Sequence, residues 1–375
     1  MSLLNRTVTT LRDFDWWLLL VSLGLTTVGL AAIYSVDLSR GESLTYFPTQ
    51  ITALVLGILV LFIAGSMHVS LYQASAVFVY GIGFLLLVLV LFLGEEIRGT
   101  TGWFRFGGFS FQPAEFAKVA LILFLGWWIQ KHRRRFDRWQ FVFTSGLSMA
   151  LFAGLIVLQP DIGSAFILGS LWFGMLLLTG TKKRYIAILL GLVVITVIFA
   201  WFFVFKGYQK ERLFTFLDPE RDPLGAGYNV TQSIIAVGAG QLTGRGLGFG
   251  SQSQLHFLPE AQTDFIFSVI AEELGFIGVA IVFTLYAILI YRLVRIALRS
   301  REDFGSYVVL GIAVLFCTHL LINVGGAIGL LPLTGVTLPF LSYGGSSLLM
   351  NFLLIGVAES IARASVTIHT QVEDV

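Results

Sequence analysis

An aspartate ends the longest polar stretch of the chain. Residues 206–263 are polar and become rich in glycine, Asp264 follows them, and an apolar run begins directly afterwards. A carboxylate at such a boundary lies where water meets the hydrocarbon of a membrane. It can serve as a general base or help to hold a cation, and its place suits a substrate with one polar and one lipid end.

Two more ionisable residues occur near the start of an apolar run. Glu115 and Lys118 follow Pro113, which suits the first turn of a helix, and their spacing of three places them on one helix face. A charge at the centre of a bilayer costs at least about 2.5–3.5 kcal/mol. The two residues therefore either neutralise each other as a structural ion pair or line a polar cavity that opens to the outside.

Three other acids have positions that allow more than one role. Asp161 follows Gln159 in a short turn between apolar runs, where it either caps the next helix or faces the same cavity. Glu272 and Glu273 lie about two turns into the run after Asp264. We expect at least one of them to bond a neighbouring helix.

The rest of the sequence contains no P-loop, no G-x-S-x-G motif and no His/Cys cluster with metal-ligand spacing. His319 is a lone histidine in an apolar run, which is more typical of a core residue than of a ligand. The glycines of 238–250 lack a surrounding βαβ unit, so they predict tight turns or a close approach of the backbone to a ligand.

The stretch 329–347 contains two prolines and several glycines. Non-helical backbone near membrane depth is tolerated only where it is buried in protein or lines a cavity. We expect this stretch to form another wall of the same pocket, with Ser342 and Ser346 among its substrate-binding residues.

The elements that position these residues are predicted to be membrane-spanning helices. The chain of 375 residues is 56% hydrophobic and 12% charged, with a mean hydropathy of +0.86. The runs long enough to cross a hydrocarbon core of about 30 Å are 16–34, 50–67, 71–93, 113–130, 139–158, 163–179, 185–205, 265–292, 305–330 and 347–363. We predict an all-α polytopic membrane protein of about ten spans, in which residues 1–375 form a single membrane domain.

The charges of the connecting segments predict the orientation. Lys and Arg concentrate in segments that follow even-numbered runs, which are 131–138, 180–184 and 292–301. By the positive-inside rule both termini then face the cytoplasm. The segments placed outside are 94–112, 159–161 and the large loop 206–264 between the seventh and eighth runs. A net charge of +2, carried by such short loops, gives no indication of nucleic-acid binding.

Four segments together resemble the SEDS family of bacterial shape, elongation, division and sporulation proteins. They are 109–124, 158–165, 216–278 and 328–347, and the resemblance covers nearly the whole chain. The stretch QSQLHFLPE, residues 252–260, is more similar to the rod-shape branch of the family than to the division branch.

The resemblance implies a peptidoglycan glycosyltransferase of the cytoplasmic (inner) membrane. Such an enzyme polymerises lipid II at the outer face, releases undecaprenyl diphosphate and serves cell elongation and shape. The resemblance also implies a divalent cation, Mg²⁺ or Mn²⁺, with unknown ligands. The implied partners are a class B penicillin-binding protein as transpeptidase, other membrane proteins of the elongation complex, and membrane lipid.

By the family's motifs, Asp264, Glu115 and Lys118 map to catalytic positions, and Asp161 maps to the aspartate of a QPD motif that includes Gln159. An α-linked donor and a β-linked product imply inversion, so a single general base is sufficient. We predict that Asp264 is this base.

The first outer loop departs from the family's pattern. Family members often carry an arginine before a tryptophan there, and this chain has Gly102 instead. If that arginine normally holds a diphosphate, Arg98 or Arg105 has to take its place. Positive charge for the leaving diphosphate can come from Lys118, Arg212, Arg105 or a divalent ion held by the acids.

Two other classes of function are consistent with ten helices and a buried Glu–Lys pair. One is a lipid II flippase, which would need access from both faces of the membrane. The other is a non-catalytic scaffold that positions a transpeptidase, for which Asp264 would be dispensable. The absence of a visible internal repeat weakens the transporter class.

Overall fold

The computed structural model of the chain describes residues 14–41, 44–97, 99–106, 109–132, 136, 138–203, five separate positions between 207 and 218, and 225–373. Its long helices are α2 (Trp16–Leu38), α3 (Tyr46–Ser66), α4 (Val69–Leu93), α5 (Pro113–Lys131), α6 (Trp139–Leu158), α7 (Ile162–Leu178), α8 (Lys183–Phe203), α12 (Ile266–Arg299), α13 (Asp303–Ala327) and α14 (Gly345–Glu373). Each of the ten apolar runs predicted from sequence lies largely on one of these helices.

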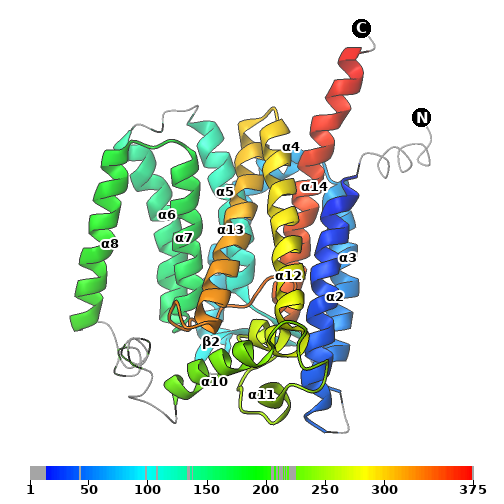
Figure 1. The fold of residues 1–375 in the computed structure, drawn as a ribbon. Helices are drawn as coiled ribbons and strands as arrows, with labels where there is room; N and C mark the ends of the chain where they lie inside the picture. The colour runs from blue at the N-terminus through cyan, green and yellow to red at the C-terminus, as the bar shows by residue number, and fades with distance from the viewer. Residues whose placement is uncertain are drawn as a thin grey trace.

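The helices run up and down through one bundle (Figure 1). Among the described residues, seven helices are long and apolar enough to cross a membrane, namely α2, α3, α4, α6, α12, α13 and α14. α7 is apolar but shorter. The predicted all-α polytopic class is therefore confirmed, whereas the count of ten spans stays a prediction.

One end of the bundle, here called the loop end, carries the irregular segments. A small antiparallel sheet of β1 (Glu95–Ile97), β2 (Thr100–Phe106) and β3 (Phe109–Phe111) lies there, with α10 (Ala226–Ala239) and α11 (Ser251–Gln254). The sequence did not predict this sheet, because strands of three to seven residues leave too short a period-2 pattern to recognise. α10 lies across the bundle rather than along it (Figure 1).

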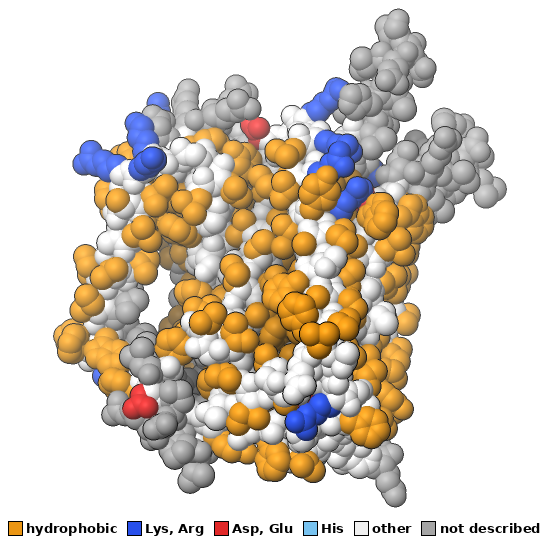
Figure 2. Space-filling view, viewed as in Figure 1, with side chains coloured by type: hydrophobic (Ala, Val, Ile, Leu, Met, Phe, Trp, Pro, Cys, Tyr) orange, Lys and Arg blue, Asp and Glu red, His pale blue; other side chains and the backbone are white. Residues whose placement is uncertain are grey.

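Basic side chains gather at the opposite end, here called the basic end (Figure 2). They come from the helix ends and connections that meet there, and include Lys131, Lys182, Lys183, Arg184, Arg292, Arg295, Arg299 and Arg301. α2 begins and α14 ends at this same end (Figure 1). This distribution is the one that the positive-inside rule associates with a cytoplasmic face.

Small residues allow the long helices to approach closely. A Cβ atom added to Gly356 of α14 would lie 2.6 Å from the backbone oxygen of Leu61 in α3, and one added to Gly57 would lie 2.6 Å from the ring of Phe352. The hydrophobic effect does not drive association between helices in lipid, so close packing of this kind holds them together instead. α8 is different, because it stands apart from the other helices and most of its described side chains are exposed (Figure 1).

α12 is broken at Gly275, whose φ of 65° no helix can contain. The carbonyls of Glu272 and Glu273 accept bonds of 3.0 and 2.9 Å from N–H groups in the loop 240–246. The first two N–H groups after the break donate to carbonyls of the same loop at 2.8 and 3.1 Å. The loop therefore satisfies the backbone groups that the break exposes, as buried backbone requires.

Two glycines of this loop, Gly240 and Gly244, fit closely against α12. A Cβ atom added to Gly240 would overlap the backbone oxygen of Ala271, and one added to Gly244 would overlap that of Glu273. Of the two roles that the sequence left open for this stretch, the structure shows the tight turns, while a close approach of the backbone to a ligand stays a prediction. Asp264, which precedes α12, is held beside this assembly.

Candidate active site

A cavity of about 190 Å³ lies at the loop end around Asp264. Its lining comes from the segment before α10, the first turns of α10, the turn before α12, the last turns of α13 and the stretch after α13. The residues are Phe216, Asn229, Val230, Pro259, Glu260, Asp264, Phe265, Ile322, Asn323, Gly326, Leu333, Thr334, Gly335 and Val336. The stretch after α13 thus forms a wall of the cavity beside Asp264, as its sequence predicted.

Tight backbone contacts fix Asp264 in the turn that leads into α12. Its N–H donates to the carbonyl of Glu260 at 3.2 Å, and its own carbonyl accepts a bond of 3.0 Å from Asn323 Nδ2. A Cβ atom added to Gly335 would lie 3.7 Å from Asp264 Oδ2, so the carboxylate faces a residue without a side chain. The φ of +70° at Gly335 is itself a conformation that favours glycine.

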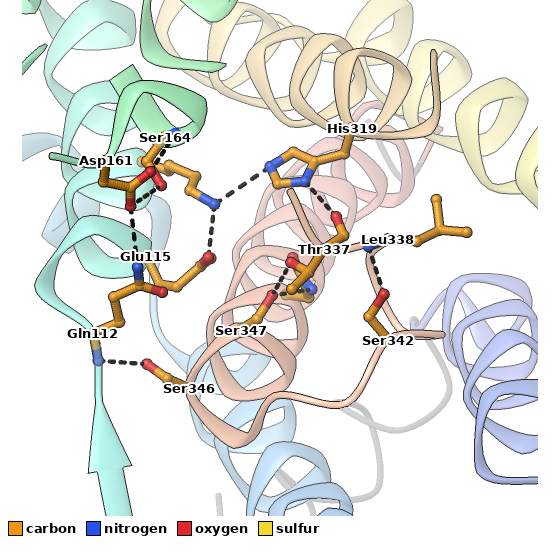
Figure 3. A network of polar contacts seen from close by, with 12 residues as sticks. Gln112, Glu115, Asp161, Ser164, His319, Thr337, Leu338, Ser342, Ser346 and Ser347 are labelled. Carbon is orange, nitrogen blue, oxygen red and sulfur yellow. Dashed lines mark hydrogen bonds and ion pairs between the residues drawn. The ribbon is translucent and has the colours of Figure 1, made fainter. Parts of the chain in front are cut away.

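Glu115 and Lys118 form an ion pair, which is one of the two arrangements that the sequence left open. Lys118 Nζ lies 2.8 Å from Glu115 Oε1, and the two side chains are 4% and 8% exposed, respectively. The same ammonium lies 3.4 Å from Nε2 of His319 on α13, whose Nδ1 lies 2.8 Å from the carbonyl oxygen of Thr337 (Figure 3). His319 is therefore buried and hydrogen-bonded, as expected of a core residue, and it is also part of this cluster.

Asp161 is the N-cap of α7. Its Oδ1 accepts the backbone N–H of Ser164 at 2.9 Å, and its Oδ2 accepts the hydroxyl of the same serine at 2.7 Å. Gln112 Nε2 approaches Oδ2 at 3.3 Å, which brings the cap towards the start of α5 (Figure 3). The capping role that the sequence allowed is thus present, while a contact of Asp161 with substrate stays a prediction.

Gln159 is buried, and its amide lies against α4 and β2. Its Nε2 donates weakly to the carbonyl of Leu87 at 3.4 Å, and a Cβ atom added to Gly102 would lie 3.2 Å from its Oε1. A larger residue at 102 would require this glutamine to shift. Gly102, which departs from the family's pattern, therefore leaves the space that the Gln159 side chain occupies in this chain.

The two serines singled out from the sequence bind protein backbone. Ser342 Oγ donates to the carbonyl of Thr263 at 2.7 Å and accepts the N–H of Leu338 at 2.8 Å. Ser346 Oγ accepts the N–H of Gln112 at 3.1 Å (Figure 3). Ser342 thereby joins the stretch after α13 to the residue before Asp264, and substrate contacts of both serines stay predictions.

Of the arginines proposed to hold a diphosphate, Arg105 is described by the structure, and it does not line the cavity. Arg105 is exposed on β2, where it pairs with Glu95 at 3.6 Å between side chains that are 57% and 56% exposed. An exposed pair of this kind contributes little to stability. Arg98 and Arg212 lie outside the described residues.

The predicted site residues thus form two neighbouring groups at the loop end and not a single cavity wall. Asp264 lines the cavity, whereas Glu115, Lys118, Asp161 and Gln159 are not among its lining residues. The groups are joined through α13 and the residues around Thr337. Within the described ranges, His, Cys, Asp and Glu side chains form no cluster of three or more that could hold a metal ion.

Glu272 and Glu273 organise the loop end and do not face the cavity. Glu272 accepts the N–H groups of Gln252 and Ser253, at 2.9 and 3.1 Å, at the start of α11. Glu273 Oε1 accepts the hydroxyl of Ser35 in α2 at 2.6 Å. The expectation that at least one of these acids bonds a neighbouring helix is confirmed.

Comparison with known proteins places the chain in a family. The model of the cell cycle proteins FtsW, RodA and SpoVE matches residues 12–367. A probable peptidoglycan glycosyltransferase FtsW from Trichlorobacter lovleyi is 37% identical over 94% of both chains, and the peptidoglycan glycosyltransferase MrdB of Escherichia coli is 35% identical over 92% of this chain and 93% of that protein.

The fold is matched by a solved structure as well. A chain from work on the structural coordination of polymerization and crosslinking by a peptidoglycan synthase complex superposes with a TM-score of 0.78. It is 30% identical and covers 94% of this chain and 98% of its own length. Because the family model and these similarities extend along nearly the entire sequence, the chain belongs to the FtsW/RodA/SpoVE family, which is the SEDS family that its motifs resemble.

Proposed function

We propose that this chain is a peptidoglycan glycosyltransferase that polymerises lipid II at the outer face of the cytoplasmic membrane for cell elongation and shape. The cavity that contains Asp264 at the loop end carries the proposal. The names of the relatives FtsW and MrdB support the reaction class. The elongation role rests on the resemblance of 252–260 to the rod-shape branch, since relatives named FtsW and MrdB have similar identities of 37% and 35%.

Lipid II has a disaccharide–peptide head and an undecaprenyl diphosphate tail, so its site needs a polar cavity with an exit to lipid. The surface is hollowed between α8 and the rest of the bundle (Figure 2). Phe216 and Asn229, which belong to the segment between α8 and α12, line the cavity. This arrangement supports a path on which the head occupies the cavity and the tail leaves sideways past α8.

The reaction forms one bond and breaks one bond at the anomeric carbon of the donor. Asp264 takes the proton of the 4-hydroxyl group of the acceptor sugar as that oxygen bonds to the anomeric carbon. The bond from this carbon to the diphosphate breaks, and undecaprenyl diphosphate leaves. Because the attack inverts the configuration, no glycosyl-enzyme forms, and one correctly placed carboxylate is sufficient.

Negative charge that develops on the departing diphosphate needs a positive partner in a site from which water is excluded. Lys118 is a described cation at the loop end whose ammonium is buried, and it is already oriented by Glu115 and His319. We assign it the role of facing the diphosphate. Glu115 then holds the ammonium in place.

The oxygen donors of the cavity fit a divalent cation. Glu260 and Asp264 are both lining residues, and the buried Oδ1 of Asn323 accepts no hydrogen bond from the described residues. Mg²⁺ is usually bound through one or two carboxylates, with substrate phosphates and waters completing the shell. Glu260 and Asn323 Oδ1 would hold it beside the base, and it would supply further positive charge to the diphosphate.

The test uses the full-length protein in liposomes with lipid II, and glycan length is measured on a gel. Asp264→Asn is nearly isosteric but cannot accept the proton, so we expect it to abolish polymerisation while the protein stays folded. Chelation of divalent ions should also stop polymerisation, and Mg²⁺ or Mn²⁺ should restore it. Full activity of the Asp264→Asn protein would refute the assignment of the base.

The same liposomes separate the two other classes of function. A flippase would move fluorescent lipid II between leaflets without forming polymer, and it would need polar access from the basic end as well as from the loop end. A scaffold would stimulate a class B penicillin-binding protein equally well with Asn at position 264. The cavity and its two acids, Glu260 and Asp264, lie at the loop end, which favours a reaction at that face of the bundle.

The orientation and the partners belong to the same proposal. The gathering of Lys and Arg at the basic end, where α2 begins and α14 ends, supports cytoplasmic termini in the inner membrane. The loop end would then meet lipid II and the transpeptidase outside. The similarity to a chain of a peptidoglycan synthase complex supports a class B penicillin-binding protein as partner, alongside other elongation proteins and membrane lipid.

A further inference from the structure

α13 carries two polar side chains on one side of a largely apolar helix. His319 and Asn323 are four residues apart, so they lie on the same face, and they are only 3% and 5% exposed. Buried polar groups destabilise a fold unless they are hydrogen-bonded. The partners of these two side chains therefore indicate their purpose.

Both side chains bind the same non-helical segment. His319 Nδ1 lies 2.8 Å from the carbonyl oxygen of Thr337, and Asn323 Nδ2 donates to the carbonyl of Val336 at 2.8 Å. A carbonyl oxygen can only accept, so the nitrogen atom is the donor in each case. Two consecutive residues of the segment are thereby held to one helix face.

Each side chain also reaches one of the proposed catalytic groups. Because Nδ1 of His319 carries the proton, its Nε2 is an acceptor, and the Lys118 ammonium lies 3.4 Å from it. Asn323 Nδ2 also donates to the carbonyl of Asp264 at 3.0 Å. A continuous set of polar contacts therefore connects Lys118 to Asp264 across α13.

We propose that His319, Asn323 and the carbonyls of Val336 and Thr337 form a polar brace that sets the position of Lys118 relative to Asp264. The inference rests on the proposed function, since it treats Asp264 as the base and Lys118 as the group that faces the diphosphate. His319 is a positioning residue in this scheme, and Asn323 positions the segment through Nδ2, whereas its Oδ1 is the atom proposed to hold a cation. A displacement of about 1 Å between reacting groups can lower a rate on the order of 100-fold, so the brace acts on kcat more than on binding.

The chain offers a matched control for the loss of one buried hydrogen bond to this segment. The hydroxyl of Tyr286 in α12 is fully buried and donates to the carbonyl of Pro339 at 2.6 Å. Pro339 lies in the same stretch as Val336, but Tyr286 is not in the brace. Tyr286→Phe should therefore lower stability by the loss of one buried hydrogen bond, without displacing Lys118 or Asp264.

The experiment measures kcat and KM for lipid II consumption by full-length protein in liposomes, together with stability against SDS unfolding. His319→Leu and Asn323→Leu should each lower kcat by about 100-fold with little change in KM. The double variant should be no slower than the slower single variant, because both substitutions break the same brace. Tyr286→Phe should lose stability and keep its kcat.

A conservative variant distinguishes positioning from folding. Glutamine at position 319 can donate from Nε2 to Thr337 and accept from Lys118 through Oε1, so His319→Gln should recover most of the kcat that His319→Leu loses. This pair of variants decides the question even if Asn323→Leu does not fold.

Two results would overturn the brace. One is a kcat loss in His319→Leu no larger than that in Tyr286→Phe, and the other is a fully additive double variant. Both are distinct from failure of the proposed function, in which the wild-type protein forms no polymer or Asp264→Asn remains active.

Discussion

Replacing Lys118 by methionine tests the buried pair at the start of α5. At the observed separation of 2.8 Å and an effective dielectric constant of about 20, the attraction between the two charges is about 6 kcal/mol. Burying each ion costs several kcal/mol, so the intact pair is close to neutral for stability. Removing one partner leaves the Glu115 carboxylate buried and uncompensated, which costs about 3–5 kcal/mol.

The double variant Glu115→Gln/Lys118→Met removes both charges and preserves the side-chain volumes. We expect its free energy of unfolding to return to within about 1 kcal/mol of the wild-type value, because replacing both members of a buried pair is often neutral. Polymerisation should stay abolished, because the ammonium that faces the diphosphate is missing. SDS titration in mixed micelles and lipid II polymerisation should be measured on the same preparations.

Exchanging the two residues provides a second control. Glu115→Lys/Lys118→Glu keeps an ion pair on the same helix face, but it moves the ammonium away from the position that meets His319. A purely structural pair would tolerate this exchange and remain active. The reasoning is refuted if Lys118→Met alone is as stable as the wild type, or if the neutral double variant still forms glycan strands.

Two further substitutions test local structure. Asp161→Ala should lower the free energy of unfolding by about 0.5–2 kcal/mol, because α7 loses its N-cap. Asp161→Asn keeps the cap and serves as the control. If the Asn variant is stable but inactive, Asp161 also contacts the substrate. Gly275→Ala should cost at least about 2 kcal/mol, since its φ is positive and an added Cβ would overlap Gly244 N. Its control is Gly191→Ala in α8, where no atom lies within 4 Å of an added Cβ; equal stability of the two variants would contradict the role of the break.

The sequence predicts the helices well because each long apolar run has only one stable form in lipid. The observed bounds of α6 are the same as the predicted run 139–158, and α5 differs by one residue. α12 and α14 extend further than predicted at the basic end. The residues there are charged and polar, so a search for apolar runs does not recognise them as helical. The sheet at the loop end and the break at Gly275 depend on hydrogen bonds between separate segments of the chain. The pattern of one apolar run cannot predict such bonds.

The candidate site was predicted less completely than the fold. Spacing along one helix was sufficient to pair Glu115 with Lys118, and a position before an apolar run was sufficient to single out Asp264. The contacts of His319 and the role of Asn323 were not predicted, because their partners lie on other segments. A usable signal was present, since two polar residues four apart in an otherwise apolar run indicate a buried polar face.

The break in α12 also separates the backbone beside the proposed base from the long part of the helix. From Phe276 to Arg299 the helix has 24 residues, and its last turns carry Arg292, Arg295 and Arg299 at the basic end. The nine residues before the break, 266–274, belong to the loop end with Asp264 and are held there by the loop 240–246. Gly275 thus allows the segment that follows Asp264 to take its direction from the loop end, independently of the direction of the long segment through the bundle.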